Sequence, residues 1–485
     1  MVSDLFLGID VGTSGVRASV MDAEGTVFAH VRVPCDFSVK TSHREHIEQD
    51  AELWWKATTS AIQKALSELK AQGLPATSIK ALSLASTSGT VVAADRNGKP
   101  LAPAILYSDG RANEEAKVAS EVGSNHCRKL GYKFGASFAL PKILWIKKHL
   151  PEVYRATTYF LSPTDFLLGR LTGRIGFEDT SNALKFGFDL IDFRWPGFLE
   201  DLGLDGGKFP QVVKTGEMLG ETHDFFEKET GLPSGVHVVA GATDGTAGLF
   251  SSGATEPGDF NTTIGTTLVV KGIATKLVVD PSGRIYSHYH PEGWWLPGGA
   301  STSGAEYLSK NFTHEEIAKP IENLEEILGG NVFVYPLARV GERFPFVNPR
   351  SRGFVEPAHP KRQRHLAASL EGIAFLERWC YEVLVELGTE AGGKIFSSGG
   401  ASESQILSRL RSTISGKEVL VPSLAETSVG AAVISASGTF YKNISEATRK
   451  MVRIERVFYP EGALVGRFNR KYEAWRSVCE QKGCG

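Results

Sequence analysis

Residues 5–25 read LFLGIDVGTSGVRASVMDAEG, and they give the clearest indication of how the chain folds. Leu5–Asp10 is an apolar run that ends in a carboxylate, which is typical of a buried strand. The glycine-containing turn Gly12–Gly15 follows it, and Val16–Met21 predicts a second strand. After another turn, the alternating residues Thr26–Val33 predict a third strand, so the chain begins with an antiparallel meander.

A second strand–turn–strand unit occurs further along the chain. Residues 260–270 read FNTTIGTTLVV, which predicts two strands joined by a turn at Gly265–Thr267. The repetition of this unit, with helical segments elsewhere, predicts an α/β protein of two related halves. We expect one domain over residues 1–250, a second over 251–440, and a strand-and-helix tail over 441–485 that packs on a domain.

Composition excludes several classes of protein. The 485 residues carry 53 Lys and Arg against 55 Asp and Glu, so no global field attracts nucleic acid or an acidic membrane. No apolar run approaches the ~20 residues that span a bilayer, and the first residues lack the features of a secretory signal. The five cysteines are widely spaced, which is typical of reduced thiols. We expect a cytoplasmic protein with no membrane or nucleic-acid partner.

Asp10 ends the first strand, directly before the glycine turn. The backbone N–H groups and hydroxyls of Gly12, Thr13 and Ser14 can face an anion, because glycine lacks the Cβ that blocks close approach. A carboxylate beside them can hold Mg²⁺, which prefers carboxylate and phosphate oxygens. The turn therefore predicts a phosphate site with Asp10 as metal ligand. The alternative is a tight hairpin in which glycine is needed only because the backbone adopts a positive φ.

Two later glycine turns favour nucleotide binding. Gly265, Thr266 and Thr267 repeat the chemistry of the first turn without the acid, so the matching turns predict a clamp on the phosphates of ATP in a cleft between the halves. Gly399 and Gly400 open a helix, whose N-terminus favours a nucleotide, and leave room for its base or ribose. Taken alone, each of these two loops is better explained as an ordinary structural connection.

Asp244 lies among glycines in the segment GATDGTAG, residues 241–248, just after a predicted strand. A carboxylate in this setting can accept the proton of a hydroxyl that attacks the γ-phosphate of ATP, which is the base role in phosphoryl transfer to an alcohol. The alternative is that Asp244 caps a helix, which the sequence predicts to begin at Gly245.

Together these segments resemble the FGGY family of carbohydrate kinases, within the actin/hexokinase/Hsp70 ATPase superfamily. The resemblance runs from Leu5 to about Phe440. It rests on the motifs quoted above and on EQDAELWW at Glu48, PAILYSDGRA at Pro103, LPKILWIKKH at Leu140 and SSGGASES at Ser397.

The resemblance implies two ribonuclease-H-like domains flanking a cleft, with Mg²⁺ as cofactor and ATP as co-substrate. It places Asp10 near the magnesium and the sugar, and Gly12, Thr13 and Ser14 at the phosphates. It makes Asp244 the catalytic base beside the sugar. It assigns Gly265, Thr266 and Thr267 to the second phosphate turn, and Gly399 and Gly400 to the adenosine loop.

The loop after the strand Ile79–Ala85 helps to choose the sugar. Glycerol kinases carry Arg-Glu there and bacterial-type xylulose kinases Met-His-Gly, whereas this chain has Ser86–Thr90, which is similar to a group of D-ribulose kinases. The small Ser88 hydroxyl leaves room for a five-carbon ketose and can bond to it. The alternative is that these hydroxyls serve only the turn. In those D-ribulose kinases Ser often follows the catalytic Asp, whereas this chain has Gly245 at that position. We expect Gly245 to lie at the sugar site.

We therefore expect an enzyme that uses ATP to phosphorylate the terminal hydroxyl of a ketopentose, with D-ribulose first and D-xylulose as the alternative. A non-catalytic ATPase-fold protein that binds sugar or nucleotide is the rival class. Asp244 and the segment at Pro103 argue against it. The oligomeric state stays open, with a homodimer as one option.

Overall fold

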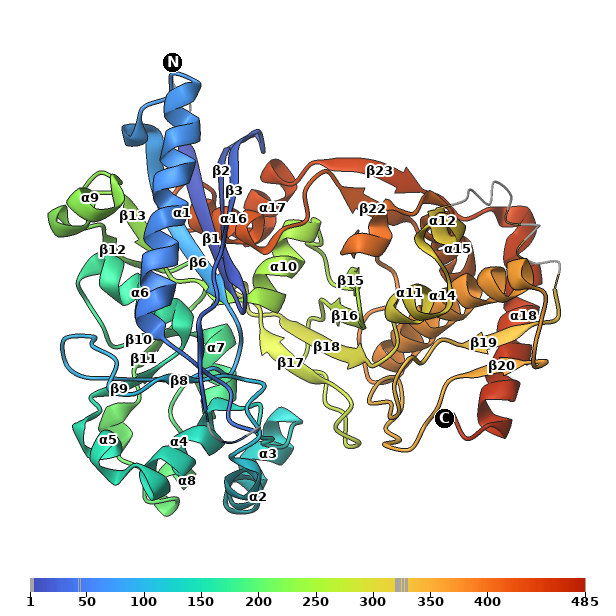
Figure 1. Cartoon of the computed structure of the whole chain (residues 1–485), viewed down its shortest axis with the longest axis horizontal. Coiled ribbons are helices and arrows are strands. Elements are labelled where there is room, and N and C mark those ends of the chain that lie inside the picture. Colours follow the sequence, from blue (N-terminus) through green and yellow to red (C-terminus); the bar gives the residue numbers. More distant parts are fainter. Residues whose placement is uncertain are drawn as a thin grey trace. The chain divides into compact units, whose positions relative to one another are not determined.

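The computed structural model describes residues 4–484 apart from 42, 44, 319–323, 325–326 and 328–329. The chain forms two compact units (Figure 1). Unit 1 contains Met1–Ser251, His288–Gly293 and Leu424–Arg453, and unit 2 contains Ser252–Ser287, Trp294–Ser423 and Ile454–Gly485. Each unit is built around its own mixed sheet, in agreement with the α/β class.

The sheet of unit 1 begins with the meander that the sequence predicts. Antiparallel pairing joins the first strand to the second and the second to the third. The main path of the sheet runs β12-β13-β6-β1-β2-β3, and β14 also pairs with β6. The strands are β1 (Leu5–Gly12), β2 (Gly15–Asp22), β3 (Val27–Pro34), β6 (Ile79–Ser86), β12 (Met218–Glu221), β13 (His237–Val239) and β14 (Ala242–Thr243).

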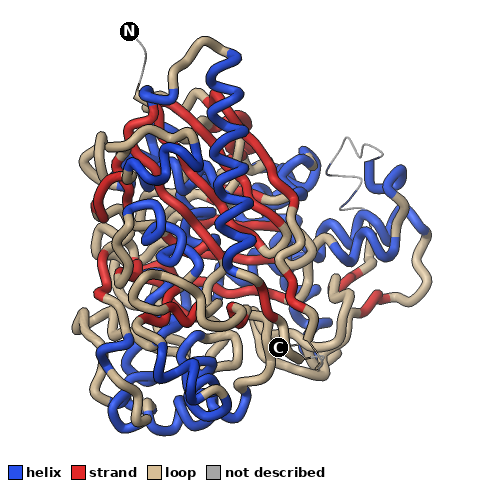
Figure 2. The backbone as a smooth tube through the Cα atoms, turned by 60° about the vertical axis from the view of Figure 1, so that its left-hand side comes forward, coloured by secondary structure: helices blue, strands red, loops and turns tan. Residues whose placement is uncertain are grey.

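Helices cover the sheet of unit 1, and every residue of Leu5–Val11 is buried. Helix α1 (Ala51–Ala71) packs on β2 and β3, and Figure 2 shows this long helix lying along the strands. Its N-cap is Asp50, as the sequence suggests: the carboxylate accepts a hydrogen bond from the Glu52 N–H at 2.9 Å.

Helix α16 (Thr427–Ser437) comes from far along the chain and packs on β1 and β6. The approach is so close that a Cβ added to Gly8 would lie 1.9 Å from the Ser428 carbonyl oxygen. The segment Leu424–Arg453 therefore belongs to unit 1. This differs from the predicted boundaries, which placed it partly in the second domain and partly in the tail, because burial of the β1–β6 face depends on contacts between distant parts of the chain.

The sheet of unit 2 follows the same path as that of unit 1. A hairpin is followed by a parallel strand beside its first arm, then by another parallel strand and an antiparallel edge strand. The order is β17-β18-β16-β15-β21-β22-β23. These strands are β15 (Phe260–Ile264), β16 (Leu268–Gly272), β17 (Tyr286–Tyr289), β18 (Trp295–Ser301), β21 (Ile395–Ser398), β22 (Val419–Pro422) and β23 (Ile454–Phe458). The prediction of two related halves agrees with this shared topology.

The remaining elements surround these sheets. In the first half of the chain they are β4 (Ser38–Val39), β5 (Glu48–Gln49), β7 (Val92–Ala94), β8 (Ala104–Ile105), α2 (Asn113–Val122), α3 (Ser124–Leu130), α4 (Ala139–His149), α5 (Pro151–Ala156), β9 (Tyr159–Leu161), α6 (Pro163–Thr172), β10 (Phe177–Asp179), α7 (Thr180–Phe186), α8 (Phe198–Asp201), β11 (Gln211–Val213), α9 (Asp224–Thr230) and α10 (Asp244–Ser252). Later elements are α11 (Glu306–Asn311), α12 (His314–Ala318), β19 (Phe333–Tyr335), β20 (Phe354–Glu356), α14 (Arg362–Glu386), α15 (Gln405–Ser415), α17 (Ile444–Met451) and α18 (Gly462–Gln481). Among the described residues, each helix is too short or too polar to span a lipid bilayer.

Gly8→Ala should destabilise unit 1, because the new methyl group meets the Ser428 carbonyl at 1.9 Å. Overpacking of this kind costs about 1–3 kcal/mol, which urea unfolding monitored by tryptophan fluorescence would measure. Gly197→Ala is the matched control, since nothing lies within 4 Å of its added Cβ. Equal stability of the two variants would show that α16 does not press on β1.

Candidate active site

Three chain segments meet at one edge of the unit 1 sheet. Strands β1 and β14 both pair in parallel with β6, and Asp10 and Ala242 are each aligned with Ala85. The chain leaves β6 toward Ser88 and leaves β14 directly into Asp244. Because parallel strands in register end at the same edge, the fold brings Asp10, Ser88 and Asp244 to one place.

Asp10 is a buried carboxylate with one cationic partner. It is 4 % exposed, and its Oδ2 accepts a hydrogen bond from Arg17 Nη1 at 3.0 Å. Burial, with a smaller contribution from the nearby charge of Asp244, raises the pKa of Asp10 from 3.8 to about 7, against the opposing effect of Arg17. The site therefore holds two mutually repelling carboxylates, and a cation would relieve that repulsion.

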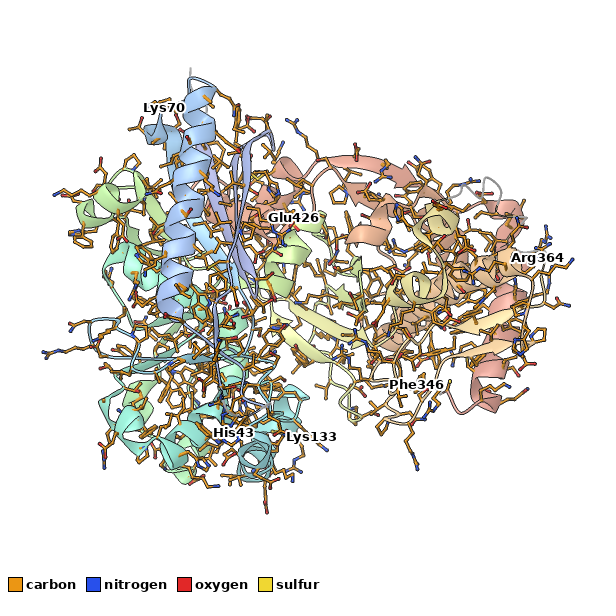
Figure 3. All side chains as sticks on the ribbon, in the orientation of Figure 1. His43, Lys70, Lys133, Phe346, Arg364 and Glu426 are labelled. Carbon is orange, nitrogen blue, oxygen red and sulfur yellow. The ribbon has the colours of Figure 1, made fainter. Side chains whose placement is uncertain are left out.

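Arg17 and Glu426 belong to this site, although the sequence argument did not select them. Arg17 is paired with Asp10 across the β1–β2 hairpin, so the hairpin register was a usable signal. Its Nε also lies 3.7 Å from Glu426 Oε2, and Glu426 is labelled in Figure 3. Glu426 precedes α16 and reaches unit 1 only through the tertiary fold, so no local pattern marks it.

Asp244 is the first residue of α10, and its side chain is exposed. Its Oδ1 accepts a hydrogen bond from the Gly245 N–H at 2.6 Å, so the carboxylate does contact the start of the helix, as the capping alternative supposed. Exposure leaves the same carboxylate accessible to a ligand. Tyr107 is a further neighbour: burial and the charge of Asp244 both raise the pKa of its hydroxyl.

The hydroxyls after β6 fall into two groups. Ser86 Oγ bonds to Thr164 Oγ1 at 2.7 Å, and Thr87 Oγ1 bonds to Thr90 Oγ1 at 3.0 Å, as the structural alternative requires. Ser88 Oγ, by contrast, is buried and makes no hydrogen bond with any part of the chain that the structure describes. A buried hydroxyl without a partner is costly, so Ser88 is the member of this loop best suited to pair with a ligand.

The first glycine turn is anchored through its backbone. The Thr13 and Ser14 carbonyls accept hydrogen bonds from Gln49 Nε2 at 2.9 Å and from the Cys35 N–H at 3.2 Å, while both side chains are exposed. A Cβ added to Gly12 would meet nothing closer than 3.7 Å, and φ of Gly12 is not in the left-handed region. Neither packing nor positive φ requires glycine at position 12, which favours the ligand-binding interpretation there.

The two glycine turns of unit 2 also share a sheet edge. Strands β15 and β21 are parallel, with Thr263 aligned with Ser398, so the turn Gly265–Thr267 and the glycines at 399 and 400 follow adjacent strand ends. Gly304 packs closely against the first of these turns, because a Cβ added to it would lie 2.6 Å from the Thr266 carbonyl oxygen. The sequence did not predict this contact.

The helix expected to open at the adenosine loop begins later than predicted. Gly399 has φ +81°, and its added Cβ would lie 2.9 Å from the Ile264 carbonyl oxygen, so glycine is required there. Gly400 begins a short 3₁₀ turn, Gly400–Glu403, and around Gly400 the space is open. Helix α15 starts at Gln405 because Ser404 is its N-cap.

Comparison with known proteins assigns the family. A profile of the N-terminal domain of the FGGY family of carbohydrate kinases matches residues 5–251, and a profile of the C-terminal domain of that family matches residues 260–438. This chain belongs to the FGGY family of carbohydrate kinases. It is therefore an ATP-dependent carbohydrate phosphotransferase, and the resemblance seen in the sequence is confirmed.

Relatives extend over nearly the whole chain. A xylulose kinase of Staphylococcus epidermidis is 26% identical to this chain, and the alignment covers 99% of this chain and 97% of the relative. A xylulose kinase of Bacillus subtilis is 24% identical over 97% of this chain and 96% of its own. The crystal structure of a Rhodospirillum rubrum xylulose kinase superimposes with a TM-score of 0.85 at 23% identity, covering 98% of both chains, which confirms the fold. D-ribulose, the sugar expected first, finds no support among these relatives.

Asp10→Asn should alter the pH dependence of stability. Because the folded pKa of about 7 exceeds the unfolded value of 3.8, the stability contributed by Asp10 is complete below the lower value and lost as the pH rises to the upper one. Asparagine does not titrate, so the variant should gain up to about 4 kcal/mol over the wild type between about pH 4 and pH 8. Urea unfolding at both pH values, without divalent cations, measures this difference. A pH-independent difference would contradict the raised pKa.

Proposed function

We propose that this kinase transfers the γ-phosphoryl group of ATP to the terminal hydroxyl of a ketopentose. The observation that carries the proposal is the exposed carboxylate of Asp244, which lies at the sheet edge shared with Asp10 and the Ser88 loop. Alcohols need a base at the moment of attack, and a carboxylate reachable from solvent at this edge is the group suited to that role.

Asp244 accepts the proton of the attacking hydroxyl. Tyr107, whose pKa is raised in part by the charge of Asp244, borders the same space. A sugar hydroxyl would supply the hydrogen-bond partner that the buried Ser88 hydroxyl lacks within the described chain. Arg17 holds the Asp10 carboxylate in place through the bond at 3.0 Å. Gly245 adds no side chain beside the base, so the sugar can approach the start of α10 closely.

The donor set at Asp10 fits a magnesium ion. Asp10 offers one carboxylate oxygen beyond the one bound to Arg17, and the repulsion between Asp10 and Asp244 favours a cation there. Magnesium, when bound, supplies positive charge that neutralises the phosphate oxygens during transfer. Asp10 is the residue that would hold it.

The phosphates and nucleoside of ATP have three glycine turns available. Gly12, Thr13 and Ser14 offer an exposed turn in unit 1, and Gly265, Thr266 and Thr267 offer the equivalent hairpin turn in unit 2. The open backbone at Gly400 is suited to the adenosine. The cleft expected between the halves, a homodimer and a cytoplasmic location stay predictions.

Two observations bear on the identity of the ketopentose, and they favour different sugars. The relatives that cover nearly the whole chain are named xylulose kinases, which favours D-xylulose. The loop Ser86–Thr90 is similar to that of a group of D-ribulose kinases, which favours D-ribulose, and its Ser88 hydroxyl has no partner within the described chain. ADP release measured with each pentulose, with glycerol and with hexuloses decides between them. Turnover of no pentulose would refute the proposal, and ATP hydrolysis insensitive to every sugar would favour the non-catalytic rival.

Asp244→Asn should lower kcat by about 10²–10⁴-fold, because the amide cannot take the proton. Binding of ADP, measured by calorimetry, should stay unchanged. Asp224→Asn is the matched control, since Asp224 is likewise the exposed first residue of a helix, α9, in unit 1. Full activity of the Asp244 variant would exclude it as the base.

Gly12→Ala should fold normally and raise KM for ATP about tenfold or more, because the new methyl group meets no protein atom closer than 3.7 Å but occupies the face offered to phosphates. Thermal unfolding checks the fold, and initial rates at varied ATP check the affinity. An unchanged KM would return the turn to its structural interpretation as a hairpin.

A further inference from the structure

Helix α7 contacts two segments of the proposed sugar site. One end contacts the residue before Asp244, and the other end contacts the loop at Ser88. Near its N-terminus, Ser181 Oγ accepts a hydrogen bond from the Thr243 N–H at 2.8 Å, and Thr243 directly precedes Asp244. Near its C-terminus, Lys185 Nζ donates a hydrogen bond to the Ser88 carbonyl oxygen at 3.3 Å. Figure 1 shows α7 near the lower end of β6.

We infer that α7 sets the distance between the base Asp244 and the sugar loop at Ser88, with Ser181 and Lys185 as positioning residues. This inference rests on the proposed function, because it assigns roles within the same site. It differs from that proposal in concerning two residues that would not touch the reacting atoms.

The N-terminal contact has a defined direction. Ser181 Oγ donates its single hydrogen to Asp179 Oδ1 at 2.6 Å, so its lone pair is left for the Thr243 N–H. Asp179 is also the N-cap of α7 and accepts from the N–H groups of Ser181 and Asn182. Thr243 is thus bonded through Ser181 to the capped end of the helix.

Asp179 is itself part of a buried acidic cluster. One carboxylate oxygen from each of Asp165, Glu178 and Asp179 lies within 4.8 Å of the other two, and all three residues are buried. The Asp179 N–H donates to Asp165 Oδ2 at 3.2 Å, and Glu178 Oε2 accepts from the Ser162 N–H at 3.0 Å. Burial raises the pKa of each carboxyl, and the charge of Asp179 adds to the rise at Asp165 and Glu178. Hydrogen bonds therefore tie the N-terminal end of α7 to Ser162 and Asp165 at the start of α6.

The C-terminal contact is equally confined. Lys185 is 7 % exposed, and its stem packs on Gly89, where an added Cβ would lie 2.9 Å from Lys185 Cδ. Gly89 has φ +86°, and its added Cβ would lie only 2.2 Å from the Ser137 carbonyl oxygen. A second lysine, Lys142, holds the segment around Ser137 by donating to the Phe138 carbonyl oxygen at 3.0 Å. The loop is thus clamped between α7 and this segment.

The two ends of α7 should have different kinetic signatures. Displacing Asp244 affects the proton transfer and so lowers kcat, whereas displacing the Ser88 loop weakens sugar binding and so raises KM. Ser181→Ala should lower kcat about tenfold or more with KM for the sugar within about twofold. Lys185→Met should raise that KM about tenfold with kcat within about threefold, and Lys185→Arg should restore most of the affinity.

Two matched controls separate positioning from general stability. Lys147→Met removes a lysine that also donates to backbone carbonyls, those of Leu202 and Gly203, from α4. Ser369→Ala removes a buried hydroxyl of α14 in unit 2, which donates to the His365 carbonyl oxygen at 2.7 Å. Both controls should leave kcat and KM within about twofold of the wild type. If Ser181→Ala fails to fold, Ser181→Cys, a weaker acceptor of similar size, replaces it.

Hydrogen exchange of the full-length protein gives a readout that needs no activity. Ser181→Ala should speed exchange of the Thr243 amide and leave that of Thr90 unchanged, and Lys185→Met should speed exchange within residues 87–90 without affecting Thr243. Unchanged exchange at both places, or kcat and KM shifts shared equally by both variants, would overturn the inference. A wild type that phosphorylates no sugar would instead refute the proposed function, while the exchange pattern would still decide whether α7 holds the two segments.

Discussion

The parallel pairing of β6 with β1 on one side and with β14 on the other is the constraint on which the site of unit 1 depends. Register along these strands leaves no freedom in where Asp10 and Asp244 emerge, because a slip of one residue would turn each side chain to the opposite face. Two carboxylates are thereby held at one edge, where burial has already made ionisation of Asp10 costly. Positive charge stabilises such a site, and Arg17 supplies part of it through its hydrogen bond to Asp10 at 3.0 Å.

The two sheets repeat one topology with different chemistry at the turns. In unit 1 the first hairpin follows an acidic strand end, whereas in unit 2 the equivalent hairpin carries only glycine and threonine. The glycines of these turns also fall into two groups, those that close contacts require and those that have space around them. At Gly15 and Gly399 the backbone of a neighbouring strand demands glycine, whereas at Gly12, Gly265 and Gly400 the surrounding protein leaves space. The second group is the one that a ligand can explain.

Local patterns predicted local features of this protein. The meander, the hairpin turns and the Asp50 cap are set by neighbours within a few residues, so alternation and capping rules sufficed. Residues brought in by the tertiary fold gave no such signal. Glu426 reaches Arg17 across most of the chain, and Gly304 supports Thr266 from another segment. The start of α15 was misplaced because a 3₁₀ turn and a Ser404 cap intervene after the glycines. The choice between two pentuloses depends on the stereochemistry of one hydroxyl, which no residue pattern in this loop determines.

The return of Leu424–Arg453 to unit 1 has a consequence for synthesis of the protein. Because translation proceeds from the N-terminus, the strands β1 and β6 leave the ribosome well before α16, which covers one of their faces. Until α16 is synthesised, the face of β1 and β6 around Gly8 lacks the helix that covers it in the folded protein. A chain truncated before residue 424 would therefore lack the helix that completes the packing of unit 1.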